Sequence, residues 1–185
     1  MAALSRILWL IAALTLGGNA IAADLENTLY MDVPAGRVVI EMRPDLAPET
    51  CAQIKRLVRQ GFYDGIVFHR VIDGFMAQTG DPKGDGTGGS GHKLKAEFSD
   101  EKHVRGVVSM ARASDPNSAD SQFFIMFAPT PSLDGKYTIW GKVVSGMEYI
   151  DQIKKGDPAR NGTVTNPDKI IKMQVAADAE KAGKS

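Results

Sequence analysis

Short apolar runs, several of them alternating with polar residues, fill most of the chain beyond residue 24. Runs of this length that are bounded by Gly, Pro and Asp predict β-strands. The first two strands are expected to pair around the turn Pro34-Ala35-Gly36. The expected strands cover residues 25–33, 37–42, 66–72, 75–79, 94–98, 106–110, 123–127, 138–143 and 169–176.

Two segments have instead the apolar spacing of a helix. Residues 48–60 have their apolar stripe at Ala52, Ile54, Leu57 and Val58. Residues 145–154 have Ser145 as a cap and inward positions at Met147, Ile150 and Ile153. About eight strands with two helices and no regular alternation predict a mainly β fold, a closed antiparallel barrel with helical lids. We expect one such domain over residues 23–177, followed by a flexible tail at residues 178–185.

The first 22 residues have the three parts of an export signal. Arg6 lies in a short basic start, residues 7–16 are almost wholly apolar, and Ala20-Ile21-Ala22 offers small residues for cleavage. An apolar core of this length is shorter than the roughly 20 residues that span a bilayer. We therefore expect a periplasmic or secreted protein that is cleaved near Ala22 and keeps no membrane anchor.

Composition excludes several classes of function. The chain has 22 basic and 22 acidic residues, and a neutral chain without a basic stripe is a poor binder of nucleic acid. Cys51 is the only cysteine, so no internal disulfide can form. Its expected place on a helix face beside Ile54 indicates a small buried side chain.

The most informative segment is residues 68–78, in which Arg70 lies among apolar and aromatic residues and Gln78 follows. A second aromatic and glutamine run lies at residues 121–127. A charge in such surroundings usually has a partner or a task, because removing it from water is costly. Arginine keeps its proton at ordinary pH and so cannot act as a general acid or base. The segment therefore favours chemistry that needs a fixed hydrogen-bond donor and moves no proton.

Four other motifs have weaker interpretations. The glycines of residues 84–89 have the spacing of a dinucleotide loop, but no helical stripe follows them, and we expect a surface loop. The three histidines lack metal-ligand spacing, so no metal site is expected. A hydrolase built on Ser121 and His69 stays an alternative, although Ser121 lacks a nucleophile elbow. Asn161-Gly162-Thr163 fits a glycosylation acceptor.

In their order along the chain these motifs resemble the cyclophilins, the cyclosporin-binding class of peptidyl-prolyl isomerases, over nearly all of residues 28–176. The segments that carry the resemblance are Phe68-His69-Arg70-Val71-Ile72, Gly74-Phe75-Met76, Gln78, Gly86-Thr87-Gly88-Gly89, Ser109-Met110-Ala111-Arg112, Ser121-Gln122-Phe123-Phe124-Ile125, Leu133-Asp134-Gly135-Lys136 and Gly141-Lys142-Val143. With the export signal and Arg112, the chain is similar to secreted bacterial members. The resemblance implies eight strands in the barrel, two capping helices, no cofactor and cis–trans isomerisation of X–Pro bonds.

The resemblance also assigns the site. Arg70 is implied as the catalytic donor to the prolyl nitrogen of a twisted amide, and Gln78 as the residue that orients either the arginine or the substrate. The implied substrate-binding residues are Phe75, Met76, Ala111, Arg112, Gln122, Phe124, Leu133 and Tyr137. The implied partners are unfolded or extended polypeptides that contain proline, bound by a monomer.

Two positions depart from the eukaryotic pattern. Ser132 stands where those members have a tryptophan, and Tyr137 where they have a histidine. The tryptophan gives a wide apolar wall and an indole donor, so we expect only weak binding of cyclosporin. Tyr137 keeps an aromatic body with a polar tip. The sequence thus predicts a prolyl isomerase for exported proteins, with a module that holds proline-rich segments without turning them as the alternative.

Overall fold

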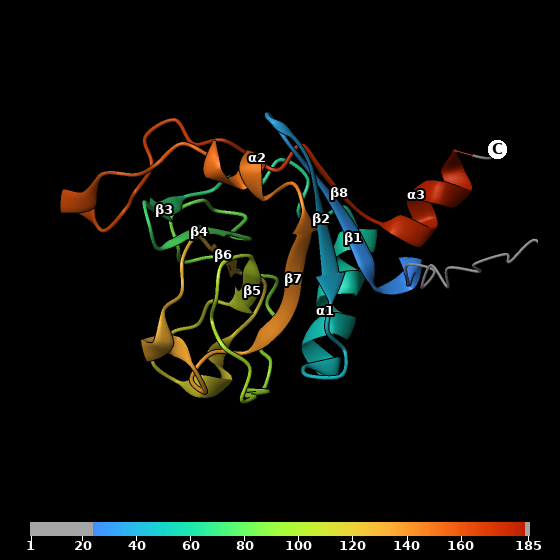
Figure 1. Cartoon of the computed structure of the whole chain (residues 1–185), viewed down its shortest axis with the longest axis horizontal. Coiled ribbons are helices and arrows are strands. Elements are labelled where there is room, and N and C mark those ends of the chain that lie inside the picture. The colour runs from blue at the N-terminus through green and yellow to red at the C-terminus, as the bar shows by residue number, and fades with distance from the viewer. Residues whose placement is uncertain (1–23, 184–185) are drawn as a thin grey trace, which may run out of the picture.

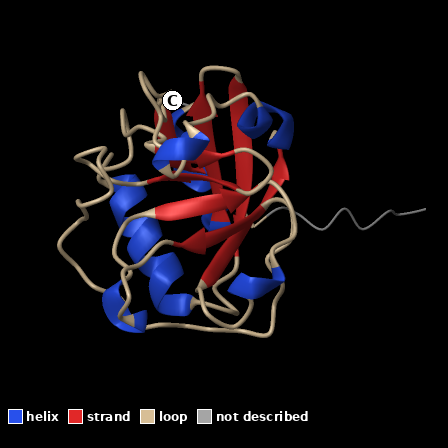
Figure 2. Cartoon of the chain, turned by 90° about the vertical axis from the view of Figure 1, so that its left-hand side faces the viewer, coloured by secondary structure: helices blue, strands red, loops and turns tan. Residues whose placement is uncertain are grey.

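An eight-stranded antiparallel sheet curves around most of the apolar side chains of residues 24–183, the part of the chain described by this computed structural model (Figures 1 and 2). The strand order is β3-β4-β6-β5-β7-β2-β1-β8. The strands are β1 (Thr28–Val33), β2 (Gly36–Met42), β3 (Arg70–Ile72), β4 (Met76–Thr79), β5 (Val107–Met110), β6 (Phe123–Met126), β7 (Ile139–Ser145) and β8 (Lys172–Val175). The mainly β class is confirmed, and β1 and β2 pair around the expected turn.

The expectation of a closed barrel is wrong, because among the described residues the sheet stays open between β3 and β8. The segments that precede these two strands are joined by one isolated bridge, between Val67 and Lys169, and by a few backbone hydrogen bonds around it, but they form no ladder. The outer edge of β3 pairs with a loop instead, through a bridge from Arg70 to Thr163 and a 2.8 Å bond from Val71 N to Gly162 O. Because this loop occupies the outer edge of β3, the backbone groups of that edge are not free to pair with β8.

Helix α1 (Pro48–Arg59) packs beside β8 and closes one side of the core, as Figure 1 shows at the right of the molecule. Cys51, Ile54, Leu57 and Val58 are buried on its inward face as expected, but Ala52 is exposed and Gln53 is buried in its place. Glu97 caps its first turn from far along the chain, since its carboxylate accepts from Glu49 N at 3.0 Å and Thr50 N at 2.9 Å. A carboxylate at this end also complements the helix dipole.

Helix α2 (Met147–Asp151) begins two residues later than expected and is shorter. Its cap is Gly146 and not Ser145, with a φ of 86° that favours glycine. A side chain at position 146 would also lie 2.6 Å from the carbonyl oxygen of Arg37. Ile150 and Ile153 are buried as expected.

The structure has a third helix, α3 (Ala176–Ala182), in addition to the two that the sequence predicts. It includes most of the segment expected to be a tail, and Asp178 accepts from Arg59 Nε at 2.8 Å. Alanine, glutamate and lysine are strong helix formers, and this outweighs the small and polar character of the segment. Whether the end of the chain is flexible stays a prediction.

Residues 94–98, expected to be a strand, form no ladder. Leu94 makes one bridge to Ala119, and further along, the Ala96 and Glu97 amides donate to the side chains of Asn117 and Thr138. The expected export signal lies outside the described residues. Within residues 24–183 no helix is long and apolar enough to cross a bilayer.

The sheet separates two apolar clusters, and strand β6 contributes to both. Phe123 and Ile125 point into the main core, which also contains Ile54, Leu57 and Trp140. The alternate positions of β6 join a smaller cluster, which we call the site cluster. Its buried members are Met76, Val107, Phe124, Met126 and Ile139, and Leu46, Ile72, Phe75, Ala111, Leu133 and Tyr137 pack against them. The two-residue period of a strand thus gives β6 one structural face and one face toward the site.

Candidate active site

Three neighbouring strands place the central residues of the site in one row. Arg70 of β3 lies opposite Gln78 of β4, and Gln78 lies opposite Phe124 of β6. His69, the residue before Arg70, points the other way and is buried, as the strand alternation predicts. The Arg70 side chain is half-buried, and this burial lowers the pKa of its guanidinium from the ordinary value.

Neutral oxygens hold the guanidinium of Arg70. Its Nη1 donates to Gln78 Oε1 at 3.1 Å, its Nε donates to the carbonyl oxygen of Asn161 at 3.0 Å, and its Nη2 donates to Asn161 Oδ1 at 3.0 Å. The Sδ atom of Met76 lies 4.0 Å from Nη1. Among residues 24–183, Arg70 has no carboxylate within ion-pair distance. The arginine is therefore fixed in direction while its charge is not neutralised by the protein.

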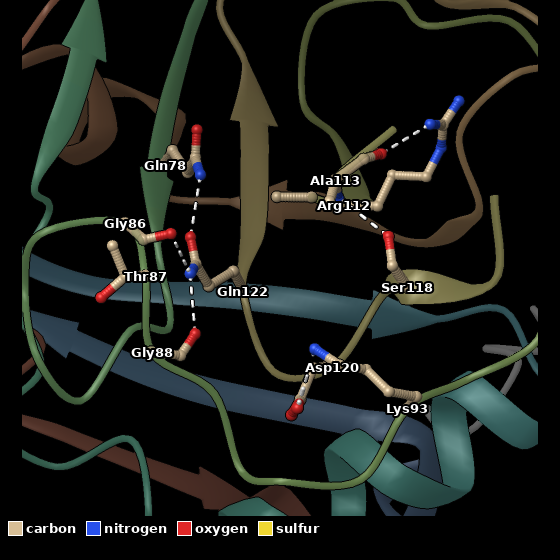
Figure 3. A pocket seen from close by; sticks show the side chains of 11 residues that line it. Gln78, Gly86, Thr87, Gly88, Lys93, Arg112, Ala113, Ser118, Asp120 and Gln122 are labelled. Carbon is tan, nitrogen blue, oxygen red and sulfur yellow. Dashed lines mark hydrogen bonds and ion pairs between the residues drawn. The ribbon is translucent and has the colours of Figure 1, made fainter. Parts of the chain in front are cut away.

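Gln78 is itself held by a chain of amide hydrogen bonds (Figure 3). Its Nε2 donates to Gln122 Oε1 at 3.0 Å, and Gln122 Nε2 donates to the carbonyl oxygens of Gly86 and Gly88 at 3.0 and 2.9 Å. The acceptors at the end of this chain fix which way each amide faces, so Gln78 presents its oxygen to Arg70. Of the two implied roles for Gln78, its contacts fit the orientation of the arginine.

A cavity of about 300 Å³ lies in front of this row. It is lined by Arg70, Phe75, Met76, Gln78, Ala111, Arg112, Phe124, Leu133 and Tyr137. The rings of Phe124 and Tyr137 meet edge to face, with centroids 5.8 Å apart and an interplanar angle of 80°. A cavity of this size, with apolar and aromatic side chains on its walls and the fixed guanidinium of Arg70 at its edge, suits a small ring such as that of proline.

Arg112 shapes this cavity by holding Tyr137. Its guanidinium carbon lies 4.6 Å from the centre of the Tyr137 ring. Its donors reach main-chain carbonyls, at 3.0 Å for Lys136, 2.8 Å for Ala113 and 3.2 Å for Ser114. The hydrogen-bonding groups of Arg112 are thus directed to the protein's own backbone, although its side chain lines the groove.

A second cavity of about 330 Å³ adjoins the first and shares Gln78, Ala111 and Arg112 with it. Its other lining residues are Gly86, Thr87, Gly88, Lys93, Ala113, Ser118, Asp120 and Gln122 (Figure 3). The glycine segment therefore forms a wall of this cavity, and residues 84–89 form a loop as expected. Because they share three lining residues, the two cavities together make one groove.

His103 packs near the rings of the cavity residues Phe124 and Tyr137 and was not identified from the sequence. Its ring is buried, stacks near Phe124 at 6.3 Å, and has Nδ1 3.1 Å from Asp134 Oδ1 and Nε2 3.2 Å from Ser109 Oγ. Because a carboxylate only accepts, Nδ1 carries the hydrogen in this pair. Burial lowers the pKa of His103 from 6.5 despite the opposing effect of Asp134.

All ten residues expected in the site meet in these two cavities, although their roles stay predictions. Asn161, which binds Arg70, was noted in the sequence only as part of a glycosylation triplet. The hydrolase alternative has no support, since Ser121 Oγ donates to the Gly80 carbonyl at 2.7 Å and both ring nitrogens of His69 are buried without a partner. Among the described residues no group of three side chains could hold a metal ion.

Comparison with known proteins agrees with this geometry. The family model described as "Cyclophilin type peptidyl-prolyl cis-trans isomerase/CLD" matches residues 28–175. The chain belongs to the cyclophilin family. It is a cyclophilin-type peptidyl-prolyl cis-trans isomerase, as the sequence predicted.

Relatives of this cyclophilin include a bacterial protein named "Probable peptidyl-prolyl cis-trans isomerase" from Brucella suis, 57% identical over 182 residues that cover 91% of this chain and 93% of the relative. A rat protein named "Peptidyl-prolyl cis-trans isomerase-like 3" is 47% identical over 69% of this chain and 81% of its own. Among solved structures, a cyclophilin from Hirschia baltica has a TM-score of 0.75 at 29% identity, covering 84% of this chain and 76% of its own. A Cryptosporidium parvum cyclophilin-type isomerase, crystallised in the presence of the dipeptide Ala-Pro, has a TM-score of 0.73 at 30% identity, covering 80% of this chain and 98% of its own.

The two departures from the eukaryotic cyclophilin pattern lie in different places. Tyr137 is part of the cavity wall, where its ring meets Phe124 and the guanidinium of Arg112. Ser132 is exposed in the short 3-10 helix Pro131–Leu133, beside the cavity residue Leu133. This cyclophilin thus keeps an aromatic wall at position 137 and presents only a small polar side chain at 132.

Proposed function

We propose that this cyclophilin turns X–Pro bonds by donating a hydrogen bond from Arg70 to the prolyl nitrogen of the twisted amide. The observation that carries the proposal is the fixed but uncompensated guanidinium at the edge of an apolar cavity. Oxygen acceptors among the described residues engage three of its five N–H groups. The rest, including the one near the weak acceptor Met76 Sδ, are left for a bound peptide.

The donor acts on the transition state more than on the ground state. In the planar amide the nitrogen lone pair is delocalised and the rotation barrier is ~18–20 kcal/mol. In the twisted amide the nitrogen regains a lone pair that can accept, so the same guanidinium binds the twisted state more tightly. No proton is transferred and no covalent bond forms.

This hydrogen bond accounts for part of the catalysis. Reducing an exchange time on the order of 100 seconds to milliseconds corresponds to a factor of roughly 10⁵, or ~7 kcal/mol. One charge-assisted hydrogen bond contributes ~1.5–3 kcal/mol. The remainder comes from the cavity, where Phe75, Phe124 and Leu133 hold the proline ring in poorly hydrated surroundings while the preceding carbonyl swings.

Exchange NMR on a short Ala-Pro peptide tests the proposal. We expect the chain without residues 1–22 to accelerate exchange. The maximal rate of Arg70→Ala should be at least about tenfold lower than that of the wild type, because one charge-assisted hydrogen bond is lost. Wild-type exchange rates in Arg70→Ala would refute this mechanism. Comparison of melting temperatures controls for folding, because Arg70 is not part of the main core.

We also propose that the clients are exported proteins that contain proline. The three-part N-terminus supports export to the periplasm or beyond. The groove, formed by the two adjoining cavities, supports the binding of extended segments. Cell fractionation with mass spectrometry of the mature N-terminus should find a chain that starts near Ala23, and an uncleaved chain in the cytoplasm would contradict this proposal.

A holding role without turnover is a second candidate, because the same groove would bind unfolded chains. The two roles separate in Arg70→Ala, which keeps the apolar walls and loses the donor. If this variant suppresses the aggregation of an unfolded protein as well as the wild type does, holding is an activity independent of isomerisation. If suppression is lost together with exchange, the isomerase accounts for both.

A further inference from the structure

A loop 91 residues away in sequence grips the proposed catalytic arginine. Asn161 accepts from Arg70 with two different oxygens, its main-chain carbonyl on Nε and its side-chain Oδ1 on Nη2, each at 3.0 Å. Two contacts on different nitrogens of a planar group fix the plane as well as the position of the guanidinium. Gln78 alone, which binds only Nη1, would leave the plane free to rotate about that bond.

The loop is anchored to the strand that bears the arginine. On both sides of Arg70 the backbone is bonded to it, with Val71 N donating to Gly162 O at 2.8 Å and Val164 N donating to His69 O at 3.1 Å. Gly156 N also donates to Val71 O at 2.8 Å. Gly162 has a φ of 78°, and any side chain there would collide with Ile72. Asn161 is therefore held in a fixed relation to β3.

Asparagine suits this position in both backbone and charge. Asn161 has a φ of 53°, in the left-handed region that few residues other than glycine and asparagine tolerate. Glycine would adopt this φ with less cost but would lack the Oδ1 acceptor. An aspartate would accept as well, but its charge would offset that of the guanidinium and weaken the donor. A neutral side chain with an acceptor fixes Arg70 and leaves its charge available.

We infer that Asn161 is a positioning residue, which sets the plane of the Arg70 guanidinium so that a free N–H faces the bound proline. This inference rests on the proposed function of Arg70. Asn161 does not line the cavity in front of Arg70. It lines a third cavity of about 470 Å³, together with Arg70 and Gln78. It therefore acts through the arginine and not on the peptide.

The chain offers a matched control for the test. Asn166 has a nearly identical φ of 51°, and it lines none of the three cavities described above. Replacing either asparagine by glycine relieves the same backbone cost, so differences between the two variants report the side chain. Asn161→Asp restores an acceptor and serves as the conservative variant.

Exchange NMR at several peptide concentrations separates the outcomes. Asn161→Gly loses the Oδ1 acceptor on Nη2 and keeps the main-chain acceptor on Nε. We therefore expect a partial loss of orientation in the transition state, with kcat lower by about threefold and KM within about twofold of the wild type. Asn166→Gly should match the wild type, and Asn161→Asp should lie between Asn161→Gly and the wild type. A wild-type kcat in Asn161→Gly overturns the inference, as does an equal loss in the two glycine variants or an aspartate variant no better than glycine.

A second readout does not depend on activity. Side-chain NMR of the Arg70 guanidinium should show hindered rotation in the wild type and faster averaging in Asn161→Gly, with melting temperatures of both within a few degrees. Unchanged rotation in Asn161→Gly overturns the inference even if the enzyme is active. If the wild type fails to accelerate exchange, the proposed function fails, and the guanidinium signal still decides whether Asn161 positions Arg70.

Discussion

The two apolar clusters of this protein share strands β3 to β7 and serve different ends. The main core is filled by residues such as Phe123, Ile54 and Trp140, all fully buried and without access to the groove. The site cluster has a buried base, but its outer members Phe75, Leu133 and Tyr137 are only partly covered and face a cavity. One strand, β6, thus stabilises the fold with one face and contributes to the candidate site with the other.

The two regions also differ in how their polar groups are fixed. Opposite the site, the sheet continues through β2 and β1, strands of seven and six residues paired in a long ladder. Around the site the strands have three or four residues. Side-chain hydrogen bonds join them to two loops, from Gln122 to the Gly88 carbonyl and from Arg70 to Asn161. Fixed donors at the site thus depend on side-chain relays, whereas stability depends on the ladder and the core.

The largest expected effect uses two neighbouring phenylalanines. Phe123→Ala should lower the free energy of unfolding by about 3–5 kcal/mol, because it leaves a cavity in the main core. Phe124→Ala should cost less stability, since it widens an existing cavity, but it should lower kcat/KM at least about tenfold. Denaturant unfolding and exchange NMR on both variants measure this contrast. If both changes lower kcat/KM per folded molecule equally, the two faces of β6 do not have separate roles.

A smaller effect is expected at Ser132, on the rim of the site. Ser132→Trp adds a wide apolar wall with an indole donor beside Leu133, so cyclosporin should inhibit the variant about tenfold more strongly than the wild type. The cyclosporin concentration that halves the rate of Ala-Pro exchange measures this difference between the two proteins. Submicromolar inhibition of the wild type that is unchanged in Ser132→Trp would contradict the expected weak binding.

The smallest effect concerns His69, on the core side of the strand that bears Arg70. Burial lowers its pKa below 6.5, and the same holds for His103. The unfolded chain then binds more protons than the folded one as pH falls through 6.5, so stability should decrease there. His69→Leu removes a buried ring that has no hydrogen-bond partner, and it should reduce this decrease by a few degrees of melting temperature without loss at pH 8.

Thermal unfolding between pH 8 and pH 5 measures this effect. If the melting temperature of His69→Leu depends on pH as steeply as that of the wild type, protonation of His69 does not cause the loss of stability. A fall in kcat at pH 8 in the same variant would show that His69 contributes to the site, contrary to its place on the other face of β3.

The sequence was sufficient for most elements because their periodicity is local. The helix at residues 48–60 and most strands follow from apolar spacing, and the ten site residues follow from motifs in a family order. The open sheet, by contrast, depends on a loop that takes the edge of β3 through Gly162 and Thr163, far along the chain. Residues 94–98 look like a strand, but side-chain acceptors such as Asn117 and Thr138 replace the ladder.

The two site residues that the sequence did not predict, Asn161 and His103, make contacts with residues far away in the chain. Asn161 and His103 have no local signal for their roles, since the first depends on a left-handed loop position and the second on burial beneath Phe124. A pattern of residue types predicts which side chains converge on the substrate. It does not predict which side chains hold them in place, because many polar residues could do so.

The maximal exchange rate of Arg70→Lys on a saturating Ala-Pro peptide tests the central claim most directly. Lysine keeps the charge but lacks the planar fork that Gln78 and Asn161 hold. The account predicts a kcat lower by roughly 10–100-fold, with KM and melting temperature close to those of the wild type. A wild-type kcat in this variant would show that a fixed guanidinium donor is not what turns the amide.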